Sequence, residues 1–194
     1  MFEALGRKKY GVILADPPWR FTTYNEDISA KSAAAHYDLL DLDAIKRMPV
    51  HDLAAPDCAL ICWGTQAQSR DLHDVVEAWG FQPKSLGAWL KLSKTGNKLA
   101  FGTGYIYRST VEFFLFATRG SPKSEVKNIR NAIIAPVREH SRKPDEMYDV
   151  IDEMFPIEQK LELFARGSRQ NWDSWGNQVD KFAPALSEVD ETGI

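Results

Sequence analysis

The sequence has no apolar run of about 18 residues, so it offers no candidate membrane span. It also has no basic segment followed by a short apolar segment, the pattern of a secretory signal, and we therefore expect a cytoplasmic protein. Cysteine is scarce: Cys58 and Cys62 lie four residues apart in one apolar stretch. Because an extended strand would hold them too far apart for a disulfide, we expect two buried free thiols.

Several catalytic fingerprints are also missing. No G-x-G-x-x-G follows a strand-like run, since Gly102-Thr103-Gly104 lacks the third glycine, and there is no phosphate-binding G-x-x-x-x-G-K-[ST]. These absences weaken readings as a dehydrogenase or a nucleotide triphosphatase. The lack of G-x-S-x-G likewise weakens acyl transfer by a serine. We expect no metal site, because the histidines show no ligand spacing: His36, His51, His73 and His140.

Acidic residues are absent from one long segment, although the chain as a whole carries a net charge of −3. Lys84 to Arg108 contains five basic residues and no acid, and Arg119 to Lys143 contains seven basic residues and two acids. The rest of the chain is therefore strongly acidic. This uneven distribution of charge is compatible with a basic surface that binds phosphates and with two solvated loops, and charge alone does not decide between them.

Apolar runs and helical periodicities alternate along the chain, which predicts an α/β protein. With 194 residues and 44% hydrophobic content, we expect one domain over residues 1–182 and a disordered acidic tail over residues 183–194. The expected strands are residues 10–14, 59–63, 84–92, 111–117, 132–135 and 160–165. The expected helices are residues 41–48, 69–79 and 145–155.

One stretch carries a possible site: Ala15-Asp16-Pro17-Pro18-Trp19, directly after the first expected strand. Open α/β sheets hold their ligands at the carboxyl ends of strands. The two prolines end the strand without donating a backbone N–H, so carbonyl and carboxylate acceptors stand beside an aromatic ring. This set suits a planar ligand with an amine, and the alternative is a proline turn with a packed tryptophan. Residues 20–36 read as a loop that could cover such a site.

Aromatic residues are interleaved with bases in a second segment, the expected loop after residue 92. Phe101, Tyr105 and Tyr107 lie among lysines and an arginine. Such a loop can stack bases and track phosphates, and it can equally be a long solvated connection.

Six segments, taken in order, resemble the MT-A type adenine methyltransferases, the family of the catalytic subunit of the eukaryotic mRNA adenosine methyltransferase and its bacterial and phage relatives. The similarity covers Lys9 to about Asp180. The matching segments are Lys9–Trp19, His36–Leu40, Trp89–Lys91, Glu112–Phe116, His140–Glu146 and Glu162–Gln178.

The resemblance implies a Rossmann-like fold that uses S-adenosylmethionine, permuted so that the amine-site motif precedes the cofactor motifs, with a mostly parallel sheet flanked by helices. It assigns the target amine to Asp16 and Pro17, with Pro18 and Trp19 completing the motif and Trp19 packing on the base. Tyr37, Trp89 and Lys91 match positions on the acceptor side. The implied cofactor residues are Ala15, Phe164, Arg166, Asn177 and Gln178.

By this resemblance we expect a site-specific DNA adenine-N6 methyltransferase, acting on DNA with a single-stranded or flipped-out adenine. An RNA adenine methyltransferase and a non-catalytic nucleic-acid-binding partner subunit are the alternatives, and a homo-oligomer is compatible with either. The residue that holds the methionine carboxylate is left unassigned, with Arg108 and Ser109 as the candidates nearest the Glu112 segment.

Overall fold

The computed structural model describes residues 1–19, 40–104 and 106–182. The expected covering loop at 20–36, Tyr37 and the expected tail at 183–194 lie outside the described residues. Seven strands are present in the described part: β1 (Tyr10–Ala15), β2 (Ala54–Gly64), β3 (Gln82–Leu92), β4 (Val111–Arg119), β5 (Ala132–Pro136), β6 (Lys160–Leu163) and β7 (Trp172–Trp175). The helices are α1 (Leu42–Lys46), α2 (Ser69–Ala78) and α3 (Glu146–Met154), with short 3-10 turns at Glu3–Leu5, Val50–Asp52 and Gln66–Gln68.

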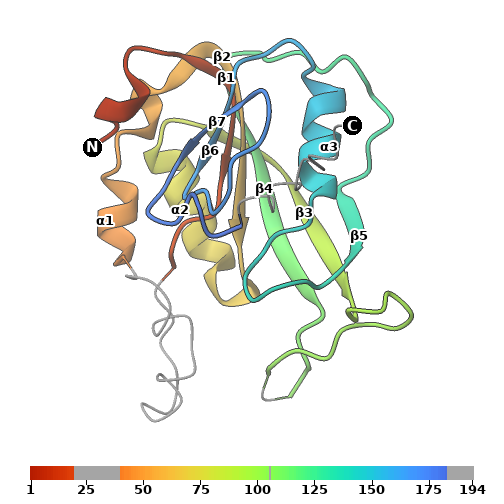
Figure 1. Ribbon diagram of the computed structural model, residues 1–194. Helices are drawn as coiled ribbons and strands as arrows, with labels where there is room; N and C mark the ends of the chain where they lie inside the picture. The colour runs from red at the N-terminus through yellow and green to blue at the C-terminus, as the bar shows by residue number, and fades with distance from the viewer. Residues whose placement is uncertain (20–39, 105, 183–194) are drawn as a thin grey trace, which may run out of the picture.

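The strands form one sheet in the order β5-β3-β4-β2-β1-β6-β7. β4 pairs antiparallel with both β2 and β3, and the other four pairings are parallel. The expected α/β class with a mostly parallel sheet is therefore confirmed. Because β1, β3 and β6 run in the same direction, their carboxyl ends meet at one edge, at the bottom of Figure 1.

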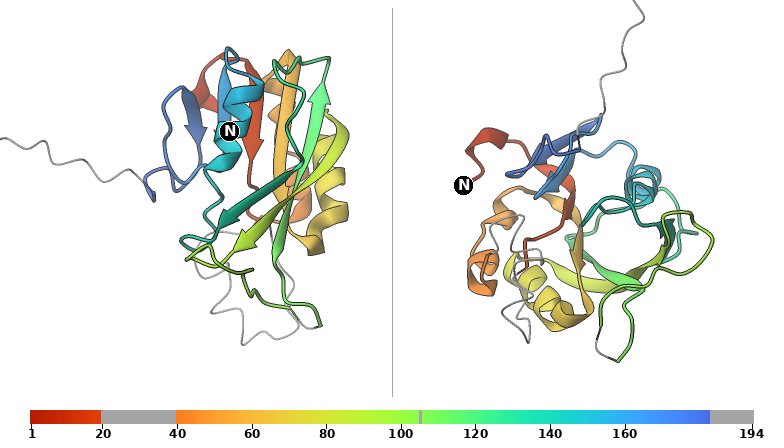
Figure 2. Two further views of the ribbon diagram at one scale, coloured as in Figure 1. Left: turned by 90° about the vertical axis from the view of Figure 1, so that its right-hand side faces the viewer. Right: turned by 60° about the horizontal axis from the view of Figure 1, so that its bottom comes forward.

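Helices cover both faces of the sheet, with α1 and α2 on one side and α3 on the other (Figure 2). The central strand β1 is buried throughout, and its side chains alternate between the two cores. Ile13 and Ala15 join the cluster that contains α2, whereas Val12 and Leu14 join the cluster that contains α3. A strand buried on both faces reads as a continuous apolar run, which is why the sequence identified it.

The six expected strands and three expected helices are all present, with ends that shift by a few residues. The structure contains one additional strand, β7, which was not predicted from the sequence. Trp172 packs into one core and Trp175 against the other, and each shares its face of the strand with a polar residue. The four-residue strand therefore shows no alternation of apolar and polar positions.

Both cysteines are buried and free, as expected. Burial raises the pKa of the Cys58 thiol to about 12 and that of Cys62 well above its ordinary value, so both remain protonated and unreactive near neutral pH. None of the helices in the described part of the chain is long and apolar enough to cross a membrane.

Candidate active site

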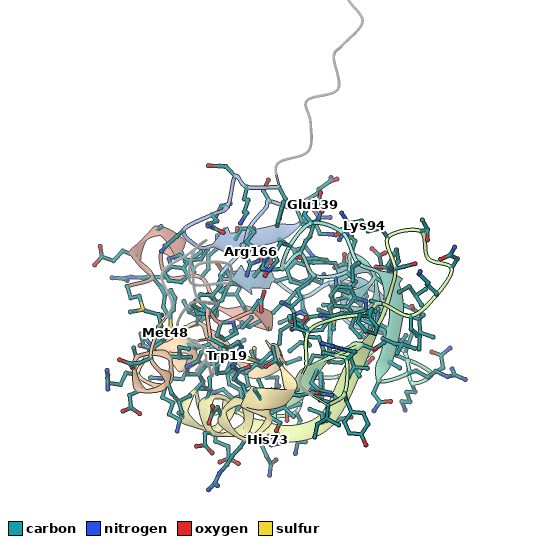
Figure 3. All side chains as sticks on the ribbon, turned by 90° about the horizontal axis from the view of Figure 1, so that it is seen from below. Trp19, Met48, His73, Lys94, Glu139 and Arg166 are labelled. Atoms are coloured by element: carbon teal, nitrogen blue, oxygen red, sulfur yellow. The ribbon has the colours of Figure 1, made fainter. Side chains whose placement is uncertain are left out.

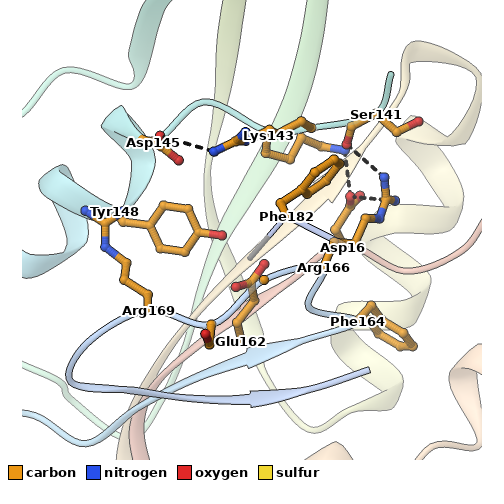
Figure 4. Close-up of a pocket in the computed structure, with 13 residues that line it drawn as sticks. Asp16, Ser141, Lys143, Asp145, Tyr148, Glu162, Phe164, Arg166, Arg169 and Phe182 are labelled. Atoms are coloured by element: carbon orange, nitrogen blue, oxygen red, sulfur yellow. Dashed lines mark hydrogen bonds and ion pairs between the residues drawn. The ribbon is translucent and has the colours of Figure 1, made fainter. Parts of the chain in front are cut away.

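Asp16 follows the last residue of β1 and lies where β1 and β6 end side by side. Ala15 pairs with Leu163 across the two parallel strands, and the Asp16 amide donates to the Leu163 carbonyl at 3.4 Å. Next to this carboxylate is a hollow of about 230 Å³ on the side of the sheet that faces α3 (Figure 4). Its lining comes from the residue after β1, the segment before α3, α3 itself, β6, and the segments after β6 and β7: Asp16, Ser141, Arg142, Lys143, Asp145, Tyr148, Glu162, Phe164, Arg166, Gly167, Ser168, Arg169 and Phe182.

Alternating charges form a continuous ion-pair chain through this site. Oδ2 of Asp16 meets Lys143 Nζ at 2.7 Å and Arg166 Nη2 at 3.4 Å. Lys143 Nζ also lies 2.8 Å from Glu112, and the second oxygen of Glu112 lies 2.7 Å from Lys91 Nζ. The chain of ion pairs therefore runs Arg166, Asp16, Lys143, Glu112, Lys91 and joins five separate segments of the fold.

The side chains of Asp16, Lys143 and Glu112 are each only 13–16% exposed, so these pairs are poorly screened by water. Burial alone would raise the pKa of Glu112, but Lys143 and Lys91 lower it to about 2. Burial likewise opposes the charge on Lys143, whose pKa is nevertheless raised by Asp16 and Glu112. These opposed shifts keep Glu112 and Lys143 charged at neutral pH.

The two oxygens of Asp16 differ. Oδ2 takes both cationic contacts, and Oδ1 meets no donor among the described residues. A carboxylate oxygen with no donor can accept a hydrogen bond from a ligand. Lys143 thus orients the carboxylate while leaving one oxygen open.

The rest of the Asp-Pro-Pro-Trp motif is partly used within the fold. The Pro17 carbonyl accepts the Trp19 amide at 2.8 Å, and the Pro18 carbonyl accepts the Leu40 amide at 3.2 Å. Each carbonyl has two lone pairs, so each can accept one more donor. Trp19 is 6% exposed, and its Nε1 donates to the Trp63 carbonyl at 3.0 Å, so its ring is packed in the core.

Phe164 and Arg166, which the resemblance assigns to the cofactor, lie at the same edge of the sheet as Asp16. The Arg166 guanidinium reaches Asp16 and also donates to the Ser141 carbonyl at 2.9 Å. Phe164 lines the hollow with φ of +64°, a conformation that is strained for a bulky residue and that ends β6 at Leu163 instead of the expected residue 165. Backbone strain of this kind is typical of functional sites.

Asn177 and Gln178 lie just beyond β7, outside the lining of the hollow. Gly176 brings this turn against β6, because a Cβ at this position would lie 2.6 Å from the Ala165 carbonyl oxygen and 2.9 Å from the carbonyl carbon of Phe164. The turn is therefore next to the Phe164 backbone, with Asn177 exposed and Gln178 accepting from Lys181.

On the acceptor side, Trp89 is 3% exposed and its Nε1 donates to the Ala135 carbonyl at 2.9 Å. It lies in the core, with the Lys91 ammonium 4.9 Å from its ring centroid. Lys91 itself is the outer end of the ion-pair chain. Tyr37 lies outside the described residues.

Sequence reasoning missed the site roles of Lys143, Glu112 and Glu162. All three stood within the segments that resemble the family but had no partner assigned, because their contacts join different elements of the fold. For the unassigned carboxylate-binding residue, Lys143 is one of the cations that line the hollow, whereas Arg108 does not line it and instead donates to the Gly104 carbonyl and stacks over Phe101.

Glu162 is an acid in the hollow that forms no ion pair with any residue that the structure describes. It points from β6 toward the hydroxyl of Tyr148 on α3 (Figure 4). Burial raises the pKa of Glu162 to about 7, and the charge of Asp16 adds to the shift, while Tyr148, Arg166 and Lys143 oppose it. The hollow therefore contains an acid that a cationic ligand would stabilise in its charged form.

Comparisons with known proteins agree with this geometry. The MT-A70 family matches residues 10–178, which include β1, the Asp-Pro-Pro-Trp motif and the turn after β7. A type II methyltransferase, M.MunI, from a Mycoplasma species is 32% identical over 213 aligned positions, covering 98% of this chain and 88% of that protein.

Two human relatives are much longer. The N(6)-adenosine-methyltransferase catalytic subunit METTL3 is 30% identical over 89% of this chain and 28% of its own length. The N(6)-adenine-specific methyltransferase METTL4 is 28% identical over 91% of this chain and 39% of its own length. With its Rossmann-like α/β sheet and its Asp-Pro-Pro-Trp site, the chain belongs to the MT-A70 family of N6-adenine methyltransferases.

Proposed function

We propose that this chain is a cytoplasmic enzyme that transfers a methyl group from S-adenosylmethionine to the N6 amine of adenine in DNA. The observation that carries the proposal is the state of Asp16. One oxygen of its carboxylate is held by Lys143, the other accepts no hydrogen bond from the residues that the structure describes, and the whole group borders a hollow that Phe164 and Arg166 also line.

The chemistry explains why such an acceptor is needed. The lone pair of the adenine amine is delocalised into the ring, so the amine is a poor nucleophile. Oδ1 of Asp16 and the remaining lone pair of the Pro17 carbonyl can each accept one N–H of the amine, which localises the lone pair on nitrogen. Fixing the amine in line with the methyl donor is then the main catalytic contribution.

The residues in the hollow fit S-adenosylmethionine, which supplies a methyl group on a sulfonium and carries an amino-acid end with both charges. Lys143 has three N–H groups and two carboxylate partners, so one N–H is left for the methionine carboxylate. Glu162 offers an anion for the ammonium group. Phe164 offers a ring for the adenine, and Asn177 and Gln178 follow at the adjacent turn.

DNA is favoured as the substrate by the extent of the matches. The type II methyltransferase belongs to a class of DNA-modifying enzymes and matches this chain along most of its own length. The chain spans only about a quarter of METTL3, whose name specifies adenosine. An RNA substrate is the second candidate, and the similarity to METTL3 is the observation in its favour.

Transfer of a tritiated methyl group tests the proposal. Adenine-containing DNA and RNA of one sequence, each single- and double-stranded, are incubated with the protein, and the labelled nucleoside is identified. We expect N6-methyldeoxyadenosine, and label in RNA alone would reverse the choice of substrate. Asp16→Ala should abolish transfer while retaining most of the cofactor binding, because Lys143 keeps Glu112 as its partner.

A non-catalytic partner subunit is separated from an enzyme by one measurement. Purified protein that fails to bind S-adenosylmethionine in calorimetry would rule out the enzyme and leave a nucleic-acid-binding module. Phe164→Ala is the control variant in this binding measurement. It removes one ring from the lining of the hollow and leaves the ion pairs of Asp16, Lys143 and Glu112 in place.

A further inference from the structure

The segment between β3 and β4, residues 93–110, projects from the sheet edge at which β1 ends (Figure 1). We call it the 93–110 arm. It exposes apolar side chains to an unusual degree: Phe101 is 81% exposed, Ile106 79% and Tyr107 88%. Its exposed bases are Lys94, Lys98 and Arg108, and it contains no acidic residue.

Backbone hydrogen bonds connect the two sides of the arm in its described part. Ser93 donates to the Lys98 carbonyl at 2.8 Å, and Ala100 donates to the Lys91 carbonyl at 2.8 Å. Further out, Gly102 and Ser109 are joined by a bond of 3.0 Å. Hydrogen bonds that close the arm on itself give its exposed rings a defined place.

Two glycines make the outer part of the arm possible. A Cβ on Gly102 would lie 2.3 Å from the Ser109 carbonyl oxygen, and one on Gly104 would lie 1.9 Å from the Tyr107 carbonyl oxygen. The Gly-Thr-Gly sequence therefore permits close backbone approach within the arm. The result is that Tyr107 and its neighbours stand clear of the sheet.

The ion-pair chain ties the arm to the candidate active site. Lys91 precedes the arm at the end of β3, and Glu112 follows it at the start of β4. These two residues are paired with each other, and Glu112 is paired through Lys143 with Asp16. Figure 3 views this edge from below, with Trp19 and Arg166 near the middle and Lys94 further out.

We propose that the 93–110 arm binds the DNA that carries the target adenine, with Lys94 and Lys98 on phosphates and Phe101 and Tyr107 stacked on bases. This inference rests on the proposed function, because it assumes a nucleic-acid substrate. Exposed rings beside unpaired lysines suit a polyanion with flat bases, whereas a protein partner would have to match an entirely basic segment. The Arg108 guanidinium already stacks over Phe101 at 5.2 Å and adds a third charge.

Salt dependence of binding tests the phosphate contacts. The full-length protein is titrated into a fluorescent, adenine-containing 30-base-pair duplex, and into the matching single strand and RNA, over a range of salt concentrations. Lys94→Ala/Lys98→Ala should weaken duplex binding roughly tenfold and reduce the slope of log affinity against log salt by about two. Cofactor binding and unfolding by urea should be unchanged.

The matched control is Lys84→Ala/Lys123→Ala. It removes the same charge from two exposed lysines that lie near the start of β3 and after the end of β4, at the ends of these strands away from the arm. We expect a smaller loss of affinity for this variant than for the arm variant. Equal losses for both would show that only net charge matters and would overturn the proposal.

Phe101→Ala/Tyr107→Ala tests stacking and should weaken binding about tenfold without changing the salt slope. Sedimentation equilibrium of the same variant distinguishes a second copy of the chain as the occupant. Loss of a dimer with unchanged DNA binding would overturn the proposal, as would RNA binding without DNA binding. Methyl transfer by the wild-type protein with a KM unaffected by the arm variants would refute the arm while leaving the proposed function intact.

Discussion

Glu162→Gln should stabilise the protein above about pH 4.5, and most of all at neutral and alkaline pH. The folded protein raises the pKa of this carboxyl from an ordinary value of 4.5 to about 7. The unfolded chain therefore releases the proton at lower pH than the folded protein does, so the free energy of unfolding falls as pH rises between these values. Below pH 4.5 both states are protonated and the carboxyl costs nothing.

The size of the effect follows from the shift. A gap of about 2.5 pKa units at roughly 1.4 kcal/mol per unit gives a cost of about 3 kcal/mol above pH 7. Glutamine is neutral, nearly the same size, and can still accept from the Tyr148 hydroxyl. We therefore expect a gain near zero at pH 4.5 that grows to about 3 kcal/mol at pH 8, or several degrees in melting temperature for a chain of this length.

Urea unfolding of both proteins from pH 4.5 to 8 measures this difference. Glu112→Gln is the matched control, because it makes the same substitution at a glutamate whose pKa is lowered to about 2 by Lys143 and Lys91. That variant should lose stability at every pH above 4.5. If Glu162→Gln instead follows the wild type at pH 8, Glu162 is solvated and the charge reasoning is wrong. Saturating S-adenosylmethionine should shrink the gain at pH 8, because its ammonium would stabilise the ionised carboxylate.

Three further perturbations probe the core, the ion-pair chain and the arm. Lys143→Met removes the cation shared by two carboxylates and leaves Asp16 with Arg166 and Glu112 with Lys91, so it should cost up to about 3–5 kcal/mol in urea unfolding at pH 7, and neutralising one carboxylate should restore part of it. Trp89→Phe should cost about 1–3 kcal/mol more than Trp63→Phe, since Trp89 donates to a buried carbonyl and Trp63 Nε1 has no partner among the described residues. Equal losses would contradict this. Gly104→Ala should distort the arm through the Tyr107 carbonyl and weaken duplex binding with an unchanged urea midpoint, whereas undiminished binding would refute that account.

The fold could be predicted from the sequence wherever one local pattern decided the structure. β1 reads as a strand because both of its faces are buried, and α3 reads as a helix because Met147 and Ile151 share a stripe that packs on the sheet. β7 could not be predicted in this way. It lies at the sheet edge, and its two tryptophans face opposite sides, so its identity depends on β6 as a partner.

The same distinction between local features and long-range contacts applies to the residues of the candidate site. Asp16 was identified because its position after a buried strand is a local feature, and its nearness to Arg166 followed from two strands that end at one edge. Lys143 was not given a role, since 127 residues separate it from Asp16 and no periodicity connects them. Glu162 was hidden for another reason: it alternates with Leu161 and Leu163 as an ordinary polar position of a strand would, and only the hollow beside it shows that the acid faces a ligand-sized space.

Contacts from outside the Asp-Pro-Pro-Trp motif orient its carboxylate. A carboxylate at a strand end could rotate freely and share both oxygens with water, which would make it a weak and poorly directed acceptor. Lys143 fixes one oxygen at 2.7 Å, and Glu112 keeps the lysine charged and in place at 2.8 Å. Because Glu112 lies at the start of β4, the strand that follows the 93–110 arm, β4 connects the residues that direct Asp16 with the residues that we propose hold DNA. A shift of β4 on DNA binding would therefore change the orientation of the Asp16 carboxylate.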